Sequence, residues 1–176
     1  MEPEKEDEIF DKEINRRSQA VKSTFEGKSN EEHLKIATEY RDNLINILFS
    51  TTALENMIDS MIAIRTKEIR SHRLLKLIRS PHVHVRQKLN LLRFADMIGE
   101  QELNDLNIIF KIRDVFAHQL IGVVNLQEVF EPFKDLQLKD MAIRKSTNDY
   151  TKFVNVVAFY VKYLNEQSKK HITAKK

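Results

Sequence analysis

The chain contains 176 residues, of which 41% are hydrophobic and 31% charged, and its net charge is +3. This length accommodates one packed core and does not require two. Cysteine is absent, which excludes disulfides, zinc sites with thiolate ligands, iron–sulfur clusters and cysteine nucleophiles. Only three glycines and three prolines occur, so long helices with few connections are expected. The acidic first residues and the lack of an apolar run of roughly 20 residues predict a soluble, cytoplasmic protein with no membrane segment.

The N-terminal residues 1–28 form the first predicted unit, a charged amphipathic helix that ends near Gly27. Its apolar residues recur at spacings of four and seven, as in a helix with one apolar face: Phe10, Ile14, Val21 and Phe25. Ser29 with Glu32 forms a capping box that starts a long second helix. The apolar positions of that helix are Leu34, Leu44, Ile47, Leu48, Leu54, Met57, Ile58, Met61 and Ile62. Farther on, its stripe carries Arg65 and His72. This indicates a functional polar inset, a snorkelling arginine or an earlier helix end, and we favour the last two together.

A basic block follows, with nine basic residues and one acidic residue between positions 65 and 93. Such a block attracts polyanions, and binding would weaken with salt. Taken alone, it is more typical of a solvated helix surface. We treat eight of these nine basic residues as candidate nucleic-acid contacts: Arg65, Arg70, Arg73, Lys76, Arg79, Arg86, Lys88 and Arg93. From Lys162 onward the chain adds five lysines against Glu166, and residues 171–176 are expected to be a basic tail.

The rest of the chain reads as further helices. Ser80 followed by Pro81 predicts a helix start, and Gly99 is expected to end that helix. The segment 100–120 has one apolar face, and Gly122 closes it. Asn125 and Glu128 are expected to cap a short helix that Pro132 halts, and an irregular connection over 133–145 follows.

The last predicted helix begins near Ser146 or Thr147 and runs to about Lys170. It is apolar on two sides, so either the fold or a second subunit must cover it twice. These segments together predict an all-α, compact bundle of about five to seven helices, with the main domain over 29–170. His82 and His84 lie about 200° apart on a helix and make no ready metal pair. No metal or cofactor is expected.

One motif connects the chain to a known family. The residues Ile112-Arg113-Asp114-Val115-Phe116-Ala117-His118 resemble the R-x4-6-H signature of the HEPN superfamily, where the position after the arginine is commonly Asn. The block from about 40 to 120, including ALENMIDSMI and VRQKLNLLRFADMIGEQELNDLNIIFKIRDVFAH, resembles the mannitol-repressor (MtlR-like) branch. The resemblance implies a helical bundle that usually dimerises, with the arginine and histidine of both copies around one cleft. Many members are metal-independent endoribonucleases; others are binding or regulatory modules.

The residue chemistry is compatible with that implication. The imidazole of His118 titrates near pH 6.5 and could transfer the proton of a ribose hydroxyl, and Arg113 suits phosphate oxygens. Asp114 lies four residues before His118 and could orient its ring. Because Arg113 and His118 are about 140° apart around an ideal helix, we tie catalysis to a homodimer.

Two functions of different classes follow. The first is an HEPN-like RNA-binding protein, either with or without endoribonuclease activity, in which the basic block guides RNA to Arg113 and His118. The second is a non-enzymatic, mannitol-repressor-like transcriptional regulator or interaction module with a regulatory protein partner, although no persuasive helix-turn-helix is visible. In a purely structural alternative, Arg113 pairs with a carboxylate and His118 stabilises the end of its helix.

Overall fold

The computed structural model describes residues 26–68, 83–118, 129–138, 143 and 148–173, with scattered positions between 12 and 23. Over these ranges the chain is helical and contains no strand, so the all-α prediction is confirmed. The described ranges hold four α-helices rather than five to seven, and one 3-10 helix. These elements are α2 (Asn30–Glu68), α4 (Val85–Phe94), α5 (Glu100–His118), η1 (Glu131–Asp135) and α8 (Asp149–Thr173).

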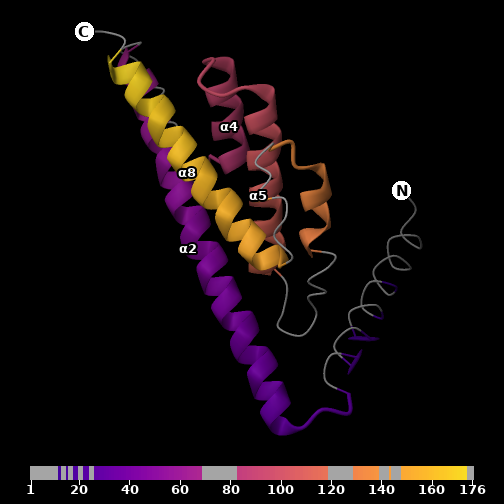
Figure 1. Cartoon of the computed structure of the whole chain (residues 1–176). Helices are drawn as coiled ribbons and strands as arrows, with labels where there is room; N and C mark the ends of the chain where they lie inside the picture. Colours follow the sequence, from indigo (N-terminus) through magenta and orange to yellow (C-terminus); the bar gives the residue numbers. More distant parts are fainter. Residues whose placement is uncertain are drawn as a thin grey trace.

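The long helix α2 organises the bundle (Figure 1). Helix α8 packs along it, and the antiparallel pair α4 and α5 packs beside it, so α2 contacts all three of the other α-helices. With 39 residues, α2 is about 58 Å long at 1.5 Å per residue. Its N-terminal part therefore extends beyond the bundle, as Figure 1 shows.

The start of α2 confirms the predicted capping box. The Ser29 amide donates to Glu32 Oε2 at 2.7 Å, and the Glu32 amide donates to Ser29 Oγ at 3.3 Å. Hydrogen bonds from the Ser29 backbone and side chain to the Glu32 carboxylate lower the pKa of Glu32 below its ordinary value. The chain reaches this cap through Gly27, whose φ of 74° is a conformation that glycine adopts without strain. The helix continues to Glu68 and contains a half-buried Arg65; His72 lies outside the described residues.

The predicted boundaries of α4 were wrong. The helix begins at Val85 instead of at Pro81, and His84 caps it. The His84 Nδ1 atom accepts from the Arg86 amide at 3.4 Å, and the His84 amide donates to Gln87 Oε1 at 3.1 Å. The helix ends at Phe94, before Gly99. An imidazole and an amide thus perform the task of the usual hydroxyl and carboxylate.

Two further boundaries differ from the sequence prediction. Gly99 stands at the start of α5, where its amide donates to Glu102 Oε2 at 2.9 Å. Val129 and Phe130 are α-helical and η1 follows directly, with Pro132 in its first turn, because that turn needs no amide donor at the proline position. The last helix begins at Asp149, and Asn148 Oδ1 accepts from the Thr151 amide at 2.9 Å. Gly122, Asn125 and Glu128 lie outside the described residues.

An aromatic row connects the helices inside the core. Tyr40 of α2 stacks on Phe116 of α5 at 5.9 Å between ring centres, and Phe116 meets Phe130 at 5.7 Å. Phe130 then contacts Phe133 of η1 and Phe153 of α8. The row ties the C-terminal part of α5 to both flanking helices. The last helix is covered largely by the fold itself, with its largest buried side chains being Phe153, Val156, Val157, Tyr160 and Leu164.

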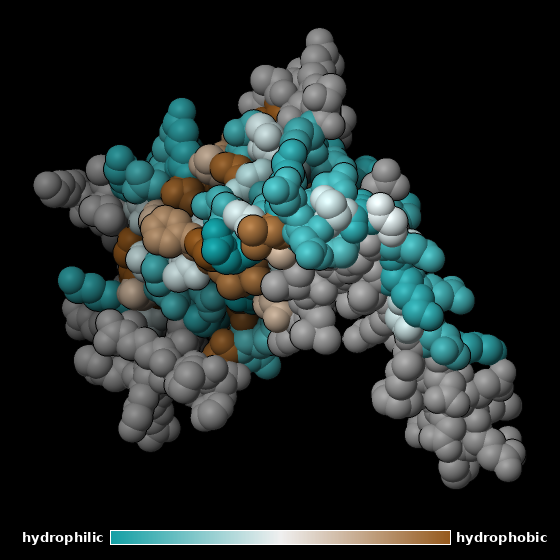
Figure 2. Space-filling view, turned by 90° about the horizontal axis from the view of Figure 1, so that it is seen from below, coloured by the Kyte–Doolittle hydropathy of each residue, from teal (hydrophilic) through white to brown (hydrophobic). Residues whose placement is uncertain are grey.

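Helix α2 is apolar on two sides, and within the part of the chain that the structure describes one of these sides packs against the other helices. Ile47, Leu54 and Ile58 are fully buried against the bundle. On another side, large apolar residues are exposed. Leu34 (70% exposed) lies near the helix start, and three residues farther along form what we call the outer patch: Ile45 (55%), Leu48 (36%) and Phe49 (79%). Figure 2 shows, on the face seen from below, hydrophobic side chains gathered among hydrophilic ones.

By length and composition alone, α2 is long and apolar enough to cross a membrane. A third of the apolar window is buried inside the structure, and a core helix of a water-soluble bundle passes the same test. The sequence prediction of no membrane segment depends on the lack of an uninterrupted apolar run, whereas this criterion uses the mean hydropathy of a window that also contains polar residues.

Candidate functional site

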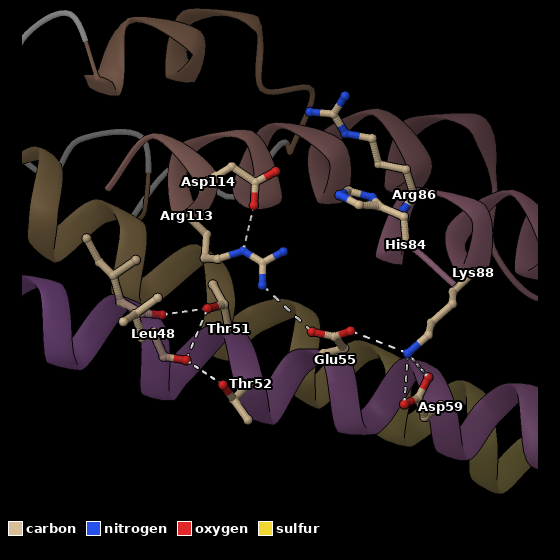
Figure 3. A network of polar contacts seen from close by, with 11 residues as sticks. Leu48, Thr51, Thr52, Glu55, Asp59, His84, Arg86, Lys88, Arg113 and Asp114 are labelled. Carbon is tan, nitrogen blue, oxygen red and sulfur yellow. Dashed lines mark hydrogen bonds and ion pairs between the residues drawn. The ribbon is translucent and has the colours of Figure 1, made fainter. Parts of the chain in front are cut away.

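Arg113 lies between a carboxylate of its own helix and one from α2 (Figure 3). Its Nε atom is 2.9 Å from Asp114 Oδ1, and its Nη1 atom is 3.8 Å from Glu55 Oε2. The guanidinium carbon is 5.3 Å from the ring centre of Phe110, within cation–π range. The Arg113 side chain is 23% exposed. The group is therefore held in place and still reachable from solvent.

Lys88 of α4 contacts the same Glu55 from the other direction (Figure 3). Its Nζ atom donates to Glu55 Oε1 at 3.3 Å and to Asp59 Oδ2 at 3.1 Å, while only 8% of its side chain is exposed. Burial opposes the charged form of Lys88, but the two carboxylates outweigh burial, so the pKa of this ammonium is raised. Lys88 thus holds α4 against α2 through charge.

We call these five residues the ion network: Glu55, Asp59, Lys88, Arg113 and Asp114. Two cations meet three carboxylates, which leaves one formal negative charge. Two buried atoms, Arg113 Nε and Asp59 Oδ1, lie within ion-pair distance of an opposite charge yet make no hydrogen bond. The network therefore anchors Arg113 without giving the region a positive potential.

The motif residues are only partly placed. Asp114 pairs with Arg113, as the structural alternative for the arginine predicts. His118 is the last residue of α5, and its side chain lies outside the described part of the structure. The pairing of Arg113 with His118 across a dimer therefore stays a prediction.

The basic block divides into members with different surroundings. Arg86 and Lys67 are exposed, and Arg65 is half-buried. Arg93 lies 3.2 Å from Glu100 Oε2 and 3.5 Å from Asp96 Oδ1, with 41% of its side chain exposed. Lys88 was predicted to contact nucleic acid, but its burial and its two carboxylate partners remove it from the surface. The remaining candidates, Arg70, Arg73, Lys76 and Arg79, lie outside the described residues.

Sequence reasoning missed the two carboxylates of α2. Glu55 and Asp59 are four residues apart and thus lie on one face of the helix. They interrupt an otherwise apolar sequence, and this interruption is the signal that could have indicated a polar inset. Their partners come from positions 29 to 58 residues later, and that separation hid the pairing.

A second polar cluster occupies the N-terminal half of α5. Asp105 is fully buried; it accepts from the Tyr160 hydroxyl at 2.7 Å and from the Gln137 amide at 2.8 Å. Burial, followed by the bond to Asp105, raises the pKa of Tyr160 far above its ordinary value, so the phenol stays protonated and donates. This cluster joins α5, α8 and the segment after η1, and it is structural.

No protein-family model, curated protein or solved structure matches this chain. Within the described residues, no group of three or more histidine, aspartate or glutamate side chains is arranged to hold a metal ion. The candidate site is therefore defined by the ion network around Arg113.

Proposed function

We propose that the protein is an HEPN-like RNA-binding homodimer whose contact surface includes Arg113 and the basic block. One observation supports this most directly: the outer patch of α2 runs into the ion network. Leu48 precedes Glu55 by seven residues, so both lie on one side of α2, two turns apart, and Figure 3 shows them along the same helix. Glu55 in turn holds Arg113.

The outer patch suits contact with a second copy. Its three apolar side chains are exposed, and contiguous exposed apolar groups on a helix mark an interaction surface. A partner copy on this patch would lie next to the ion network. Arg113 would then border a groove between the two copies, where the basic block supplies positive charge for RNA phosphates.

The charge balance favours binding over cleavage. Phosphoryl transfer is promoted by cations that stabilise the charge of the transition state, whereas the ion network carries an excess carboxylate. Endoribonuclease activity is our second candidate function, because the partly exposed Arg113 and the helix-terminal His118 keep the order of the motif. The third candidate function is that of a regulator, in which a protein partner instead of RNA occupies the groove between the two copies.

The dimer is tested with a charge on the outer patch. We expect F49E to be monomeric in sedimentation experiments at micromolar concentration, while the unaltered chain is dimeric. Phe94 provides a matched control, because it is another highly exposed phenylalanine (86%) that lies on α4. F94E should stay dimeric. An unaltered chain that sediments only as a monomer would refute the dimer.

RNA binding and cleavage are measured together, with fluorescent single-stranded RNA in buffer containing EDTA. We expect salt-dependent binding by the unaltered chain and by H118A. Cleavage that survives EDTA and is lost in a folded H118A would establish the nuclease. Binding without cleavage supports a binding protein, and the absence of RNA binding, alongside capture of one specific protein, would establish the regulator instead.

A further inference from the structure

A polar groove of about 500 Å³ lies between α4 and α5, away from the ion network. Two of its residues come from α4 and four from α5: Arg86, Asn90, Asn104, Asn107, Ile108 and Lys111. This volume falls in the range of small-ligand sites. The groove therefore has room for a ligand of the size of one nucleotide.

Helix geometry explains why these residues meet. Arg86 and Asn90 are four residues apart on α4, and Asn104, Asn107 and Lys111 recur at three and four on α5, so each set lies along one face. The short turn between the helices makes them antiparallel neighbours. The opposite side of α4, with Lys88, Leu89 and Leu92, is buried in the bundle.

The groove carries unbalanced positive charge. No carboxylate lines it, and among the described residues neither Arg86 nor Lys111 forms an ion pair. Lys111 interacts electrostatically with Glu131, whose carboxylate is already 2.7 Å from Lys134 Nζ. Two cations that face an open groove without partners suit a phosphate.

The amide side chains supply hydrogen bonds of both kinds. The Asn104 Nδ2 atom donates to the Asp135 carbonyl at 3.3 Å and lies 3.4 Å from Asp105 Oδ1, so this amide is oriented and its own oxygen can still accept. Asn90 and Asn107 make no hydrogen bond to other described side chains. Ile108, only 8% exposed, gives the groove an apolar floor. Amides over an apolar floor suit the edge and face of a nucleobase.

We propose that this groove binds one nucleotide of the single-stranded RNA, with Arg86 and Lys111 on the phosphate and Asn90 and Asn107 on the base edge. The inference rests on the proposed RNA-binding function and adds the place where a base is recognised. In this proposal the exposed Arg86 binds the phosphate of that nucleotide, at a place separate from the surface near Arg113.

The first experiment follows the asparagine side-chain amides by NMR during titration with 5′-AMP, with inorganic phosphate as a second probe. We expect AMP to shift the Asn90 and Asn107 signals, and phosphate to shift the groove backbone with smaller effects on these amides. If neither probe moves any groove signal at millimolar concentration, the proposal is overturned.

The second experiment compares two double variants by RNA anisotropy. N90A/N107A leaves the charge unchanged, and we expect about tenfold weaker RNA binding with an unaltered salt slope. R86A/K111A should weaken binding and reduce the salt slope by about two. K162A, which removes an exposed lysine of α8, is the charge control for one cation. Circular dichroism melts confirm folding.

The outcomes separate the two proposals. RNA binding that persists unchanged in N90A/N107A and R86A/K111A overturns the groove while the RNA-binding function stands. If the unaltered chain binds no RNA but AMP still shifts the groove amides, the function proposed above fails and the groove is a site for a free nucleotide. A chain that binds neither RNA nor AMP overturns both.

Discussion

Helix α5 carries two polar clusters in which buried charge is stabilised by different kinds of partner. At Asp105 both carboxylate oxygens accept hydrogen bonds from neutral donors, and the side chain is fully buried. At Arg113 charges meet charges, the contacts are longer, and the side chains are 8% to 42% exposed. The first arrangement fixes one packing of the helices, whereas the second leaves charged groups accessible to a ligand.

This difference indicates where stability and function separate along one helix. Removing a buried carboxylate whose oxygens accept hydrogen bonds is costly, because a donor that stays buried then has no acceptor. A partly exposed ion network costs less to break, since water replaces the lost partner. We therefore expect mutations at Asp105 to affect folding, and mutations at Arg113 to affect binding.

The largest effect on stability is expected for D105A. The substitution leaves the Tyr160 hydroxyl without its acceptor in the core, a loss that costs about 1–3 kcal/mol. It also removes the acceptor of the Gln137 amide, which belongs to an exposed residue. We expect the free energy of unfolding, measured in urea, to fall by about 3 kcal/mol. Y160F removes the hydroxyl donor itself, so no unsatisfied hydroxyl remains in the core, and the free energy of unfolding should fall by less than in D105A. An equal loss in both variants would contradict this account.

An intermediate effect is expected for K88M, which leaves Glu55 and Asp59 without their buried cation. Because both carboxylates are partly exposed, we expect a loss of about 1–2 kcal/mol. The raised pKa of Lys88 sets the pH dependence. The charge of Lys88 stabilises the fold below the ordinary lysine pKa of 10.5, and this contribution disappears as the pH rises through the higher pKa of the folded state. The difference in melting temperature between K88M and the unaltered chain should therefore be constant at neutral pH and shrink above pH 10.5.

The smallest effect on stability, with the largest effect on binding, is expected for R113A. Its ion pairs are partly exposed, so we expect less than about 1 kcal/mol of destabilisation. RNA affinity should fall several-fold at fixed salt, because a phosphate contact is lost. K162A removes an exposed cation of α8 and should leave affinity unchanged. If R113A destabilises as strongly as D105A, Arg113 is a structural residue.

Local signals in the sequence predicted local structure well. The capping box at Ser29 and Glu32, the long helix after it, and the apolar face of α5 all depend on spacings of three to seven residues, and the structure confirms them. The start of α4 was misplaced because the Ser80–Pro81 pair is a strong local signal, whereas a cap made of His84 and Gln87 uses side chains outside the usual hydroxyl and carboxylate pattern.

The surroundings of the candidate site were beyond local reasoning. The motif identified Arg113 and Asp114, but which carboxylate of α2 meets the arginine depends on how two helices pack. The basic block shows the same limit, since Lys88 and Arg86 are two residues apart in one charged segment, yet one faces α2 and the other solvent. Two residues apart on a helix means about 200° around its axis, but which of the two sides meets α2 depends on how the helices pack.

The bond from the Gln137 amide to Asp105 has a consequence for dynamics. Gln137 belongs to an irregular stretch after η1, where amides normally exchange their hydrogens with solvent within minutes or faster. Its hydrogen instead points at a buried carboxylate that also holds α8. This amide should exchange only when the segment after η1 leaves α5, so a loop position would report how firmly that segment is held.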